Sequence, residues 1–173
     1  VAALPSGLTE AVIGNLRIDW PTWSLRGRQL VADLVARGIT IVNGDHTFLA
    51  DRLPELAHAI RDLRKFVIDP SQPFYTDDLV ARPWQLRVLS AGMDSNIGKM
   101  TVSLLVRRAL RNAGRTAAFI ATGQIGMLLE GDGVPLDALP LDFAHRSVQQ
   151  LMLKSTDEAL VVEGQGSIFH PVF

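Results

Sequence analysis

The sequence predicts an α/β fold with parallel sheets, and three observations predict it. Amphipathic helical stripes alternate along the chain with short apolar runs rich in β-branched residues, which is typical of a parallel α/β layer. A glycine-bounded loop with a lysine, at residues 92–99, lies between one such run and a helical pattern. Hydrophobic residues make up 47% of the 173 residues and charged residues 20%, so a sizeable core is available.

In the first part of the chain, helices and strands are expected to alternate. Residues 1–17 are assigned to no element, because their apolar residues show only weak periodicity. The β-branched run Ile39–Val42 predicts a buried strand. Before it, a helix is predicted for Leu25–Arg37, with Gly38 as its stop and one apolar stripe formed by Leu30, Val31, Leu34 and Val35.

The same alternation continues towards a domain boundary. Phe66–Ile68 is expected to be the next strand. Few periodic apolar positions follow in Phe74–Gln85, so we place the boundary there, with a first part at residues 1–83 and a second at residues 84–173. Between the two strands of the first part, Pro54 is expected to open a helix whose inner face carries Leu56, Ala57, Ile60 and Leu63.

A phosphate-binding motif opens the second part. Val88–Ala91 is an apolar run that predicts a buried strand, and a helix is predicted from Lys99 to Asn112, with Gly114 as its stop. Strand, glycine-rich loop, lysine and helix are the parts of a P-loop, in which loop N–H groups, the helix N-terminus and the lysine attract phosphate. The expected phosphate-binding residues are Gly92, Asp94, Ser95, Asn96, Ile97, Gly98, Lys99, Met100 and Thr101.

This loop departs from the common spacing G-x-x-x-x-G-K-[ST] in two ways. One extra residue separates Gly92 from Gly98, and Met100 replaces the hydroxyl residue after the lysine. Met100 cannot hold Mg²⁺ as a hydroxyl would, and Thr101 points about 100° further round the helix. A site that binds a diphosphate without cleaving it needs that ligand less, which argues against ATP hydrolysis.

Further elements follow the P-loop helix. Thr116–Ala121 and Ala159–Val162 are predicted strands, and residues 128–142 have a loop-like composition. Asp142 is expected to be the N-cap of a helix at Phe143–Lys154. A solvated face of the P-loop helix is expected to carry Arg107, Arg108 and Arg111.

Three of the predicted strands end in polar turns, where ligands of parallel sheets bind. In Thr122–Gly126, Gln124 offers donors and an acceptor, and this turn lies beside the P-loop if their strands are neighbours. Glu163 ends another strand, and a carboxylate there can lie near phosphates or their Mg²⁺. His46 follows a third strand. Each of these turns also has a purely structural alternative. Gly123 and Gly126 allow a tight turn, Glu163 caps a turn, and His46 stabilises its own turn by a hydrogen bond.

These motifs resemble two groups of proteins. The loop at residues 92–99 and the Glu-Gly-x-Gly turn at residues 163–166 are similar to those of dethiobiotin synthetase. The Lys-Met-Thr ending, Ala-Thr-Gly-Gln at residues 121–124 and Glu-Gly-Gln-Gly-Ser followed by His170-Pro171 more closely resemble a bacterial family of two-part P-loop proteins that includes D-glutamate N-acetyltransferase. Asp45 and Ile125 depart from that family's pattern.

The resemblance implies a fold in which a smaller Rossmann-like α/β domain precedes a parallel-sheet P-loop NTPase-like domain. Members of that family have a first strand upstream of Val1 and continue beyond Phe173, so we expect this chain to lack both pieces.

The resemblance also implies transfer of an acetyl group from acetyl-CoA to the amino group of D-glutamate or a similar amino acid. Lys99 and the loop amides would hold the CoA diphosphate. Glu163 and His170 are the candidate bases, and Gln124 and Ser167 are the candidate donors for the oxyanion. Two alternatives stay open: an ATP-dependent ligase or kinase, in which Lys99 stabilises the γ-phosphoryl and Glu163 holds Mg²⁺, and a non-catalytic nucleotide-binding regulator.

Composition bounds the partners and the compartment. The net charge is −1, so there is no basic excess to indicate nucleic-acid binding. No apolar run is long enough to span a bilayer. The chain has no cysteine, and its amino end shows no basic segment before an apolar one, which is typical of a cytoplasmic protein. We expect a small amino-acid substrate and a homo-oligomer, since pairing is common among such folds.

Overall fold

The structure, a computed structural model, describes residues 7–13, 25–65, 82 and 84–169. The chain divides into two compact units, Val1–Lys65 and Phe66–Phe173. Each unit contains a three-stranded parallel sheet, so the predicted α/β class is confirmed. Within the described ranges, no helix is long and apolar enough to cross a membrane.

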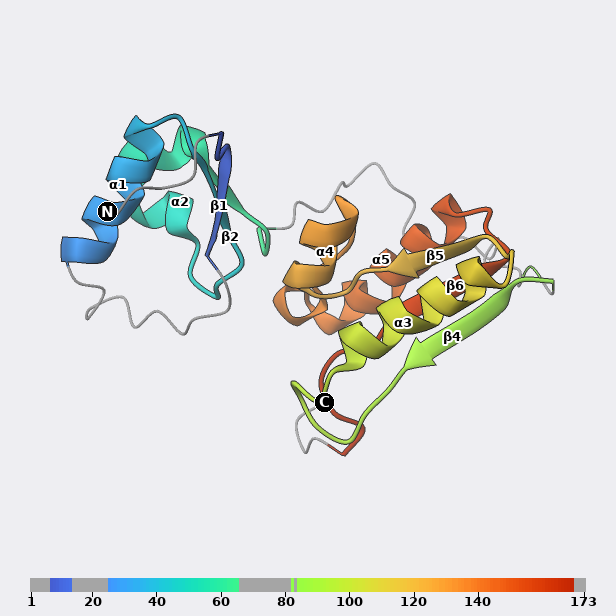
Figure 1. Ribbon diagram of the computed structural model, residues 1–173. Coiled ribbons are helices and arrows are strands. Elements are labelled where there is room, and N and C mark those ends of the chain that lie inside the picture. The colour runs from blue at the N-terminus through green and yellow to red at the C-terminus, as the bar shows by residue number, and fades with distance from the viewer. Residues whose placement is uncertain (1–6, 14–24, 66–81, 83, 170–173) are drawn as a thin grey trace. The chain divides into compact units, whose positions relative to one another are not determined.

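The first unit is a parallel sheet in the order β1-β2-β3, with α1 between its first two strands in sequence (Figure 1). Its elements are β1 (Glu10–Ile13), α1 (Leu25–Ala36), β2 (Thr40–Asn43), α2 (Leu49–Arg52), the 3₁₀ helix η1 (Pro54–Ala59) and β3 (Ile60–Asp62). Gly38, at φ +76°, ends α1, and its N–H donates to the carbonyl of Val35 at 2.9 Å. The predicted helix and the predicted strand β2 are confirmed. The buried core of this unit consists of Val31, Ile41, Leu49 and Leu53.

Two predictions for the first unit are wrong. Ile60 lies in β3 and pairs with Ile41, because Pro54 opens only a six-residue 3₁₀ helix and not the expected α-helix. Glu10–Ile13 forms β1, although the weak periodicity of residues 1–17 indicated no element. The strand predicted at Phe66–Ile68 lies outside the described residues.

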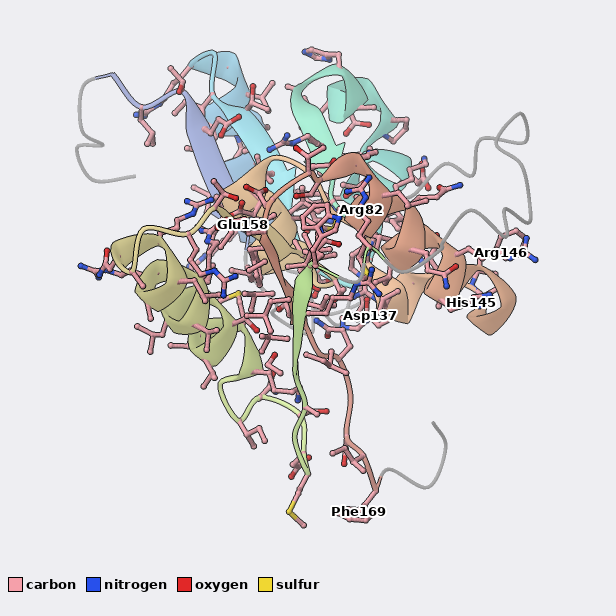
Figure 2. All side chains as sticks on the ribbon, turned by 90° about the vertical axis from the view of Figure 1, so that its right-hand side faces the viewer. Arg82, Asp137, His145, Arg146, Glu158 and Phe169 are labelled. Carbon is pink, nitrogen blue, oxygen red and sulfur yellow. The ribbon has the colours of Figure 1, made fainter. Side chains whose placement is uncertain are left out.

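The second unit is a parallel sheet in the order β4-β6-β5. Figure 2 shows this sheet edge-on, with α3 on one face and α5 on the other. The predicted P-loop helix and all three predicted strands of this unit are present, but β4 is not buried as predicted, because it lies at an edge of the sheet and Leu89 is 63% exposed. The elements are β4 (Leu86–Ser90), α3 (Lys99–Asn112), β5 (Ala117–Ile120), α4 (Gln124–Glu130), the 3₁₀ helix η2 (Leu136–Ala138), α5 (Leu141–Lys154) and β6 (Ala159–Glu163).

The strand order corrects one expectation about the site. β5 is not the neighbour of β4, because β6 pairs with both of them and lies between them. The turn after β5 therefore adjoins the turn that begins at Glu163, and not the P-loop directly. The last residue of β6, Glu163, pairs with Ser90 at the end of β4, so the P-loop and the Glu163 turn start at the same level of the sheet.

Local details of the second unit also differ from expectation. Residues 128–142 are not all loop, because α4 extends to Glu130 and η2 follows. Arg107 is not on a solvated face: its guanidinium pairs with Glu130 at 2.5 Å and lies over the ring of Phe119. The N-cap position of α5 is Pro140 and Asp142 is the second residue of the helix, so the predicted N-cap position is wrong.

Candidate functional site

The P-loop is curled between β4 and α3. Asn96 and Gly98 both have left-handed backbones, at φ +58° and +94°. The side chain of Ile97 folds back over Gly92, where an added Cβ would lie 2.4 Å from Ile97 Cδ1. A larger residue at position 92 would therefore have to displace the side chain of Ile97. The N-cap of α3, Gly98, provides no side-chain hydrogen bond, so no side chain at the cap competes with an anion for the first amides of the helix.

Lys99 points back into the loop. Its Nζ donates to the carbonyl of Asp94 at 2.7 Å and to the carbonyl of Gly166 at 2.8 Å. An ammonium group has three N–H donors, so one remains for a ligand. Two backbone carbonyls thus fix the ammonium between the P-loop and the turn that follows β6.

The turn after β6 is bound to the P-loop at further points. The N–H of Ile168 donates to the carbonyl of Gly92 at 2.9 Å, and Ser167 Oγ donates to the carbonyl of Met93. Because a hydroxyl has one proton, this contact occupies the group that the sequence assigned to the oxyanion. In the described structure, Ser167 therefore holds the loop in place.

Two serines and a glycine join the ends of β4 and β6 to α3. The fully buried Ser103 donates from Oγ to Ser90 Oγ at 2.7 Å, and Ser90 Oγ accepts the N–H of Gly164 at 3.2 Å. A Cβ on Gly164 would lie 1.9 Å from the carbonyl oxygen of Ser90, so this crossing requires glycine. Sequence reasoning missed both serines, although their positions at a strand end and on the inner side of a helix were available as signals.

The predicted phosphate-binding residues differ in exposure. Lys99 and Met100 are half-buried, while Asp94, Ser95, Asn96, Ile97 and Thr101 are exposed. In the exposed part of the loop, Asp94 Oδ1 accepts the N–H of Ser95 at 2.7 Å. The residue after Lys99 carries no hydroxyl, and α3 begins at Lys99 itself.

Glu163 links the ends of β6 and β5. Its Oε2 accepts the N–H of Thr122 at 3.0 Å and the N–H of Gly123 at 3.1 Å, while its carbonyl accepts Thr122 Oγ1 at 2.7 Å. The residue is buried. The carboxylate thus holds the turn after β5 by one oxygen, and Oε1 accepts no hydrogen bond from the described residues. Sequence reasoning missed the part played by Thr122, whose hydroxyl also accepts Gln165 Nε2 at 3.2 Å.

Gln124 is the first residue of α4 and is buried, with 9% of its surface exposed. Its side-chain amide makes no hydrogen bond within the part of the chain that the structure describes. It directly follows Gly123, whose N–H binds Glu163, so the structure brings Gln124 and Glu163 to adjoining turns. His170 lies outside the described residues.

The loop after β2 forms a separate polar cluster in the first unit. Asn43 Nδ2 donates to Asp62 Oδ1 at 2.6 Å and to the carbonyl of Thr47 at 2.7 Å. Asp45 is buried and its Oδ2 accepts the N–H of Thr47, whereas His46 is exposed. Asn43 and Asp45, rather than His46, shape this loop.

The donor set of the second unit fits a diphosphate better than a metal ion. Lys99 and the uncapped N-terminus of α3 supply positive charge and free amides. No group of three His, Cys, Asp or Glu residues that could hold a metal occurs among the residues described. A cavity of about 340 Å³ lies along β5, between Glu130 and Asp157, away from the predicted site residues that the structure describes.

Comparisons with known proteins agree with this geometry. Residues 81–173 match the family described as "Domain of unknown function (DUF1611_C) P-loop domain". Two curated relatives are named D-glutamate N-acetyltransferase: the protein from Tritonibacter scottomollicae is 34% identical over 91% of this chain and 46% of its own length, and that from a Pseudoalteromonas species is 31% identical over 83% and 44%.

A solved structure is similar as well. The crystal structure of a DUF1611 family protein from Anabaena variabilis superposes with a TM-score of 0.77 and 34% identity, covering 95% of this chain and 48% of that one. The chain spans about half the length of the curated relatives that it matches. Motifs, fold and comparisons lead to the same conclusion: the chain belongs to the DUF1611 P-loop domain family.

Proposed function

We propose that this chain binds a CoA diphosphate through its P-loop and belongs to an N-acetyltransferase that acts on D-glutamate or a similar amino acid. The observation that carries the proposal is the position of Lys99, whose ammonium is held by two carbonyls beside the uncapped N-terminus of α3. The names of the two curated relatives support the acyl-transfer class.

The residue after Lys99 supports a site that binds a diphosphate without cleaving it. A P-loop that hydrolyses ATP normally holds Mg²⁺ by the hydroxyl at this position. Met100 offers only a thioether, and Thr101 is exposed on another side of the helix. Acetyl-CoA, when bound, supplies an activated acetyl thioester.

The residues of the chain would then bind the diphosphate, accept a proton from the substrate amine and donate hydrogen bonds to the substrate. Lys99 and the loop amides hold the diphosphate, which orients the ligand along the carboxyl edge of the sheet. Glu163 offers its free Oε1 as a proton acceptor for the substrate amine, because Oε2 is already bonded to two amides. Gln124 has amide donors without partners in the described structure, and a negatively charged oxygen of a substrate can accept from them.

A ligand comparison tests the proposal. Thermal unfolding is measured with acetyl-CoA, CoA, ATP and ATP–Mg²⁺ for the unaltered chain and for Lys99→Ala. Binding to the folded state raises the unfolding temperature by mass action. We expect acetyl-CoA and CoA to raise it in the unaltered chain and to lose most of that effect in Lys99→Ala.

Lys154→Ala is the matched control, because Lys154 is an exposed lysine that pairs with Asp132 away from the P-loop. Its response to CoA should equal that of the unaltered chain. A shift with ATP–Mg²⁺ and none with the CoA compounds would overturn the acetyltransferase proposal in favour of a ligase or kinase. An unfolding temperature that none of the four ligands changes, in a folded sample, would overturn the proposal that the P-loop binds phosphate.

A further inference from the structure

Glu163 ends β6 and binds the turn after β5, and Gln124 directly follows that turn as the first residue of α4. Within the described structure, Glu163 Oε1 and the side-chain amide of Gln124 form no hydrogen bond. We propose that they form the subsite for the acceptor amino acid, in which Glu163 Oε1 binds the ammonium group and Gln124 binds the carboxylate on the same carbon. This inference rests on the proposed function and assigns Gln124 to the acceptor substrate instead of the oxyanion.

The charge of Glu163 is the first argument. The side chain is buried, with 6% of its surface exposed, and its carboxylate forms no ion pair with any residue described. Buried charges in proteins are normally paired, because an isolated carboxylate away from water is costly. Two amide donors bind Oε2 alone. A cation supplied by a ligand at Oε1 completes the pairing.

The nearby lysine does not supply that cation. Lys99 directs two of its three N–H donors to the carbonyls of Asp94, in the P-loop, and Gly166, in the turn after β6. Glu163 accepts at Oε2 the N–H groups of Thr122 and Gly123, in the turn after β5. The two charged groups therefore have different partners, Lys99 in a cationic half-site for the diphosphate and Glu163 in an anionic half-site.

An ammonium ion fits the anionic half-site better than Mg²⁺ does. Mg²⁺ requires near-octahedral oxygen coordination, which proteins usually build from one or two carboxylates together with phosphates and waters. The described residues contain no group of three or more acidic, histidine or cysteine ligands, and Met100 removes the usual hydroxyl ligand. An ammonium group needs only acceptor oxygens at hydrogen-bond distance.

Gln124 provides the second half of the subsite. The residue is buried, with 9% of its surface exposed, and its side-chain amide makes no hydrogen bond within the described chain. Its NH₂ group can donate to a carboxylate oxygen. In an α-amino acid the ammonium and the carboxylate sit on one carbon, which matches an acceptor and a donor on adjoining turns.

Glycines keep these two turns close together. A Cβ on Gly126 would lie 2.6 Å from Glu163 Oε2, and a Cβ on Gly123 would lie 2.7 Å from Gln165 Nε2. A larger residue at either position would therefore have to displace the side chain of Glu163 or of Gln165. This packing fixes Glu163 and leaves its second oxygen for the substrate.

Calorimetric titration with two probes tests the subsite, in the presence of saturating CoA. D-glutamate carries the amino group, and glutarate is the same dicarboxylate without it. We expect the unaltered chain to bind D-glutamate at least tenfold more tightly than glutarate. Glu163→Gln should erase this preference, because the amide still accepts the two N–H groups but has lost its charge. Gln124→Leu should weaken the binding of D-glutamate and of glutarate by a similar factor and keep the preference for D-glutamate.

Glu158→Gln is the matched control. Glu158 is an exposed acid that directly precedes β6, and Figure 2 shows it at the opposite end of this strand from Phe169. Its affinities should equal those of the unaltered chain. Equal binding of both probes to the unaltered chain, or a D-glutamate preference that survives in Glu163→Gln, would overturn the subsite. Mg²⁺ binding that Glu163→Gln abolishes, without any D-glutamate preference, would overturn it too.

CoA affinity, measured in the same titrations, separates this inference from the proposed function. If CoA binds in a Lys99-dependent manner but D-glutamate shows no dependence on Glu163, the subsite alone is wrong. If the binding of D-glutamate depends on Glu163 but CoA does not bind, the proposed subsite is supported and the proposed function is wrong. Circular dichroism of each variant verifies that it is folded.

Discussion

Replacement of Glu163 by alanine and by glutamine should have very different effects on stability. Alanine removes the acceptor of two N–H groups, those of Thr122 and Gly123, and both residues are buried. Each unsatisfied buried amide costs roughly 1–3 kcal/mol, and water that enters the vacated space recovers part of this, so we expect a loss of about 3 kcal/mol. Glutamine keeps an acceptor oxygen and removes an unpaired buried charge, so its loss should be about 1 kcal/mol or less.

Hydrogen exchange measures this difference within the second unit, which matters because a chain of two units need not unfold in one step. The amide of Val161, in the fully buried middle of β6, reports the opening of the unit. A loss of about 3 kcal/mol corresponds to exchange that is roughly 100-fold faster. If Val161 exchanges at the same rate in Glu163→Ala and Glu163→Gln, the hydrogen bonds to the turn after β5 do not stabilise the unit and the reasoning is refuted.

Two further predictions concern glycines. Gly164→Ala should cost about 3 kcal/mol, because the new Cβ would lie 1.9 Å from the carbonyl oxygen of Ser90. Gly114→Ala has open space around it and only a left-handed backbone at φ +80°, so it should cost about 1–2 kcal/mol; equal urea midpoints for the two variants would contradict the clash. Gly126→Ala should cost about 2 kcal/mol, because it displaces Glu163 from its two amides, which costs about 3 kcal/mol, while alanine in the helix regains about 1 kcal/mol. NMR shifts of those amides check the displacement, and unchanged shifts would show that the turn absorbs the methyl group.

The sequence was informative wherever a pattern spans many residues. The helix α3 and its stop were predictable because apolar residues recur at helical spacing over residues 102–110 and Gly114 marks the end. The loop Gly92–Lys99 was predictable because glycines, lysine and a following helix occur together. β1 and β3 were not predictable, because β1 lies in a stretch of weak periodicity and Ile60 fits a helical stripe as well as a strand.

Contacts within the site depend on packing that sequence spacing does not encode. Strand-end motifs placed Glu163 and Gln124 at the carboxyl edge of a sheet, yet the strand order that makes their turns adjoin came only from the structure. The same holds for Lys99, whose partner carbonyl at Gly166 is 67 residues away in sequence. The hydroxyl of Ser167 donates to the carbonyl of Met93 in the P-loop, and no local sequence pattern predicts this contact either.

Binding of a diphosphate by the P-loop is tested most directly by comparing the affinity for CoA with the affinity for pantetheine, which lacks the diphosphate and the nucleotide. Dissociation constants are measured for the unaltered chain and for Lys99→Ala. In the proposed site the third N–H of Lys99 binds the diphosphate and no other part of CoA, so the substitution should weaken CoA binding at least tenfold and leave pantetheine binding unchanged. CoA binding that is equally tight in both proteins would contradict the account.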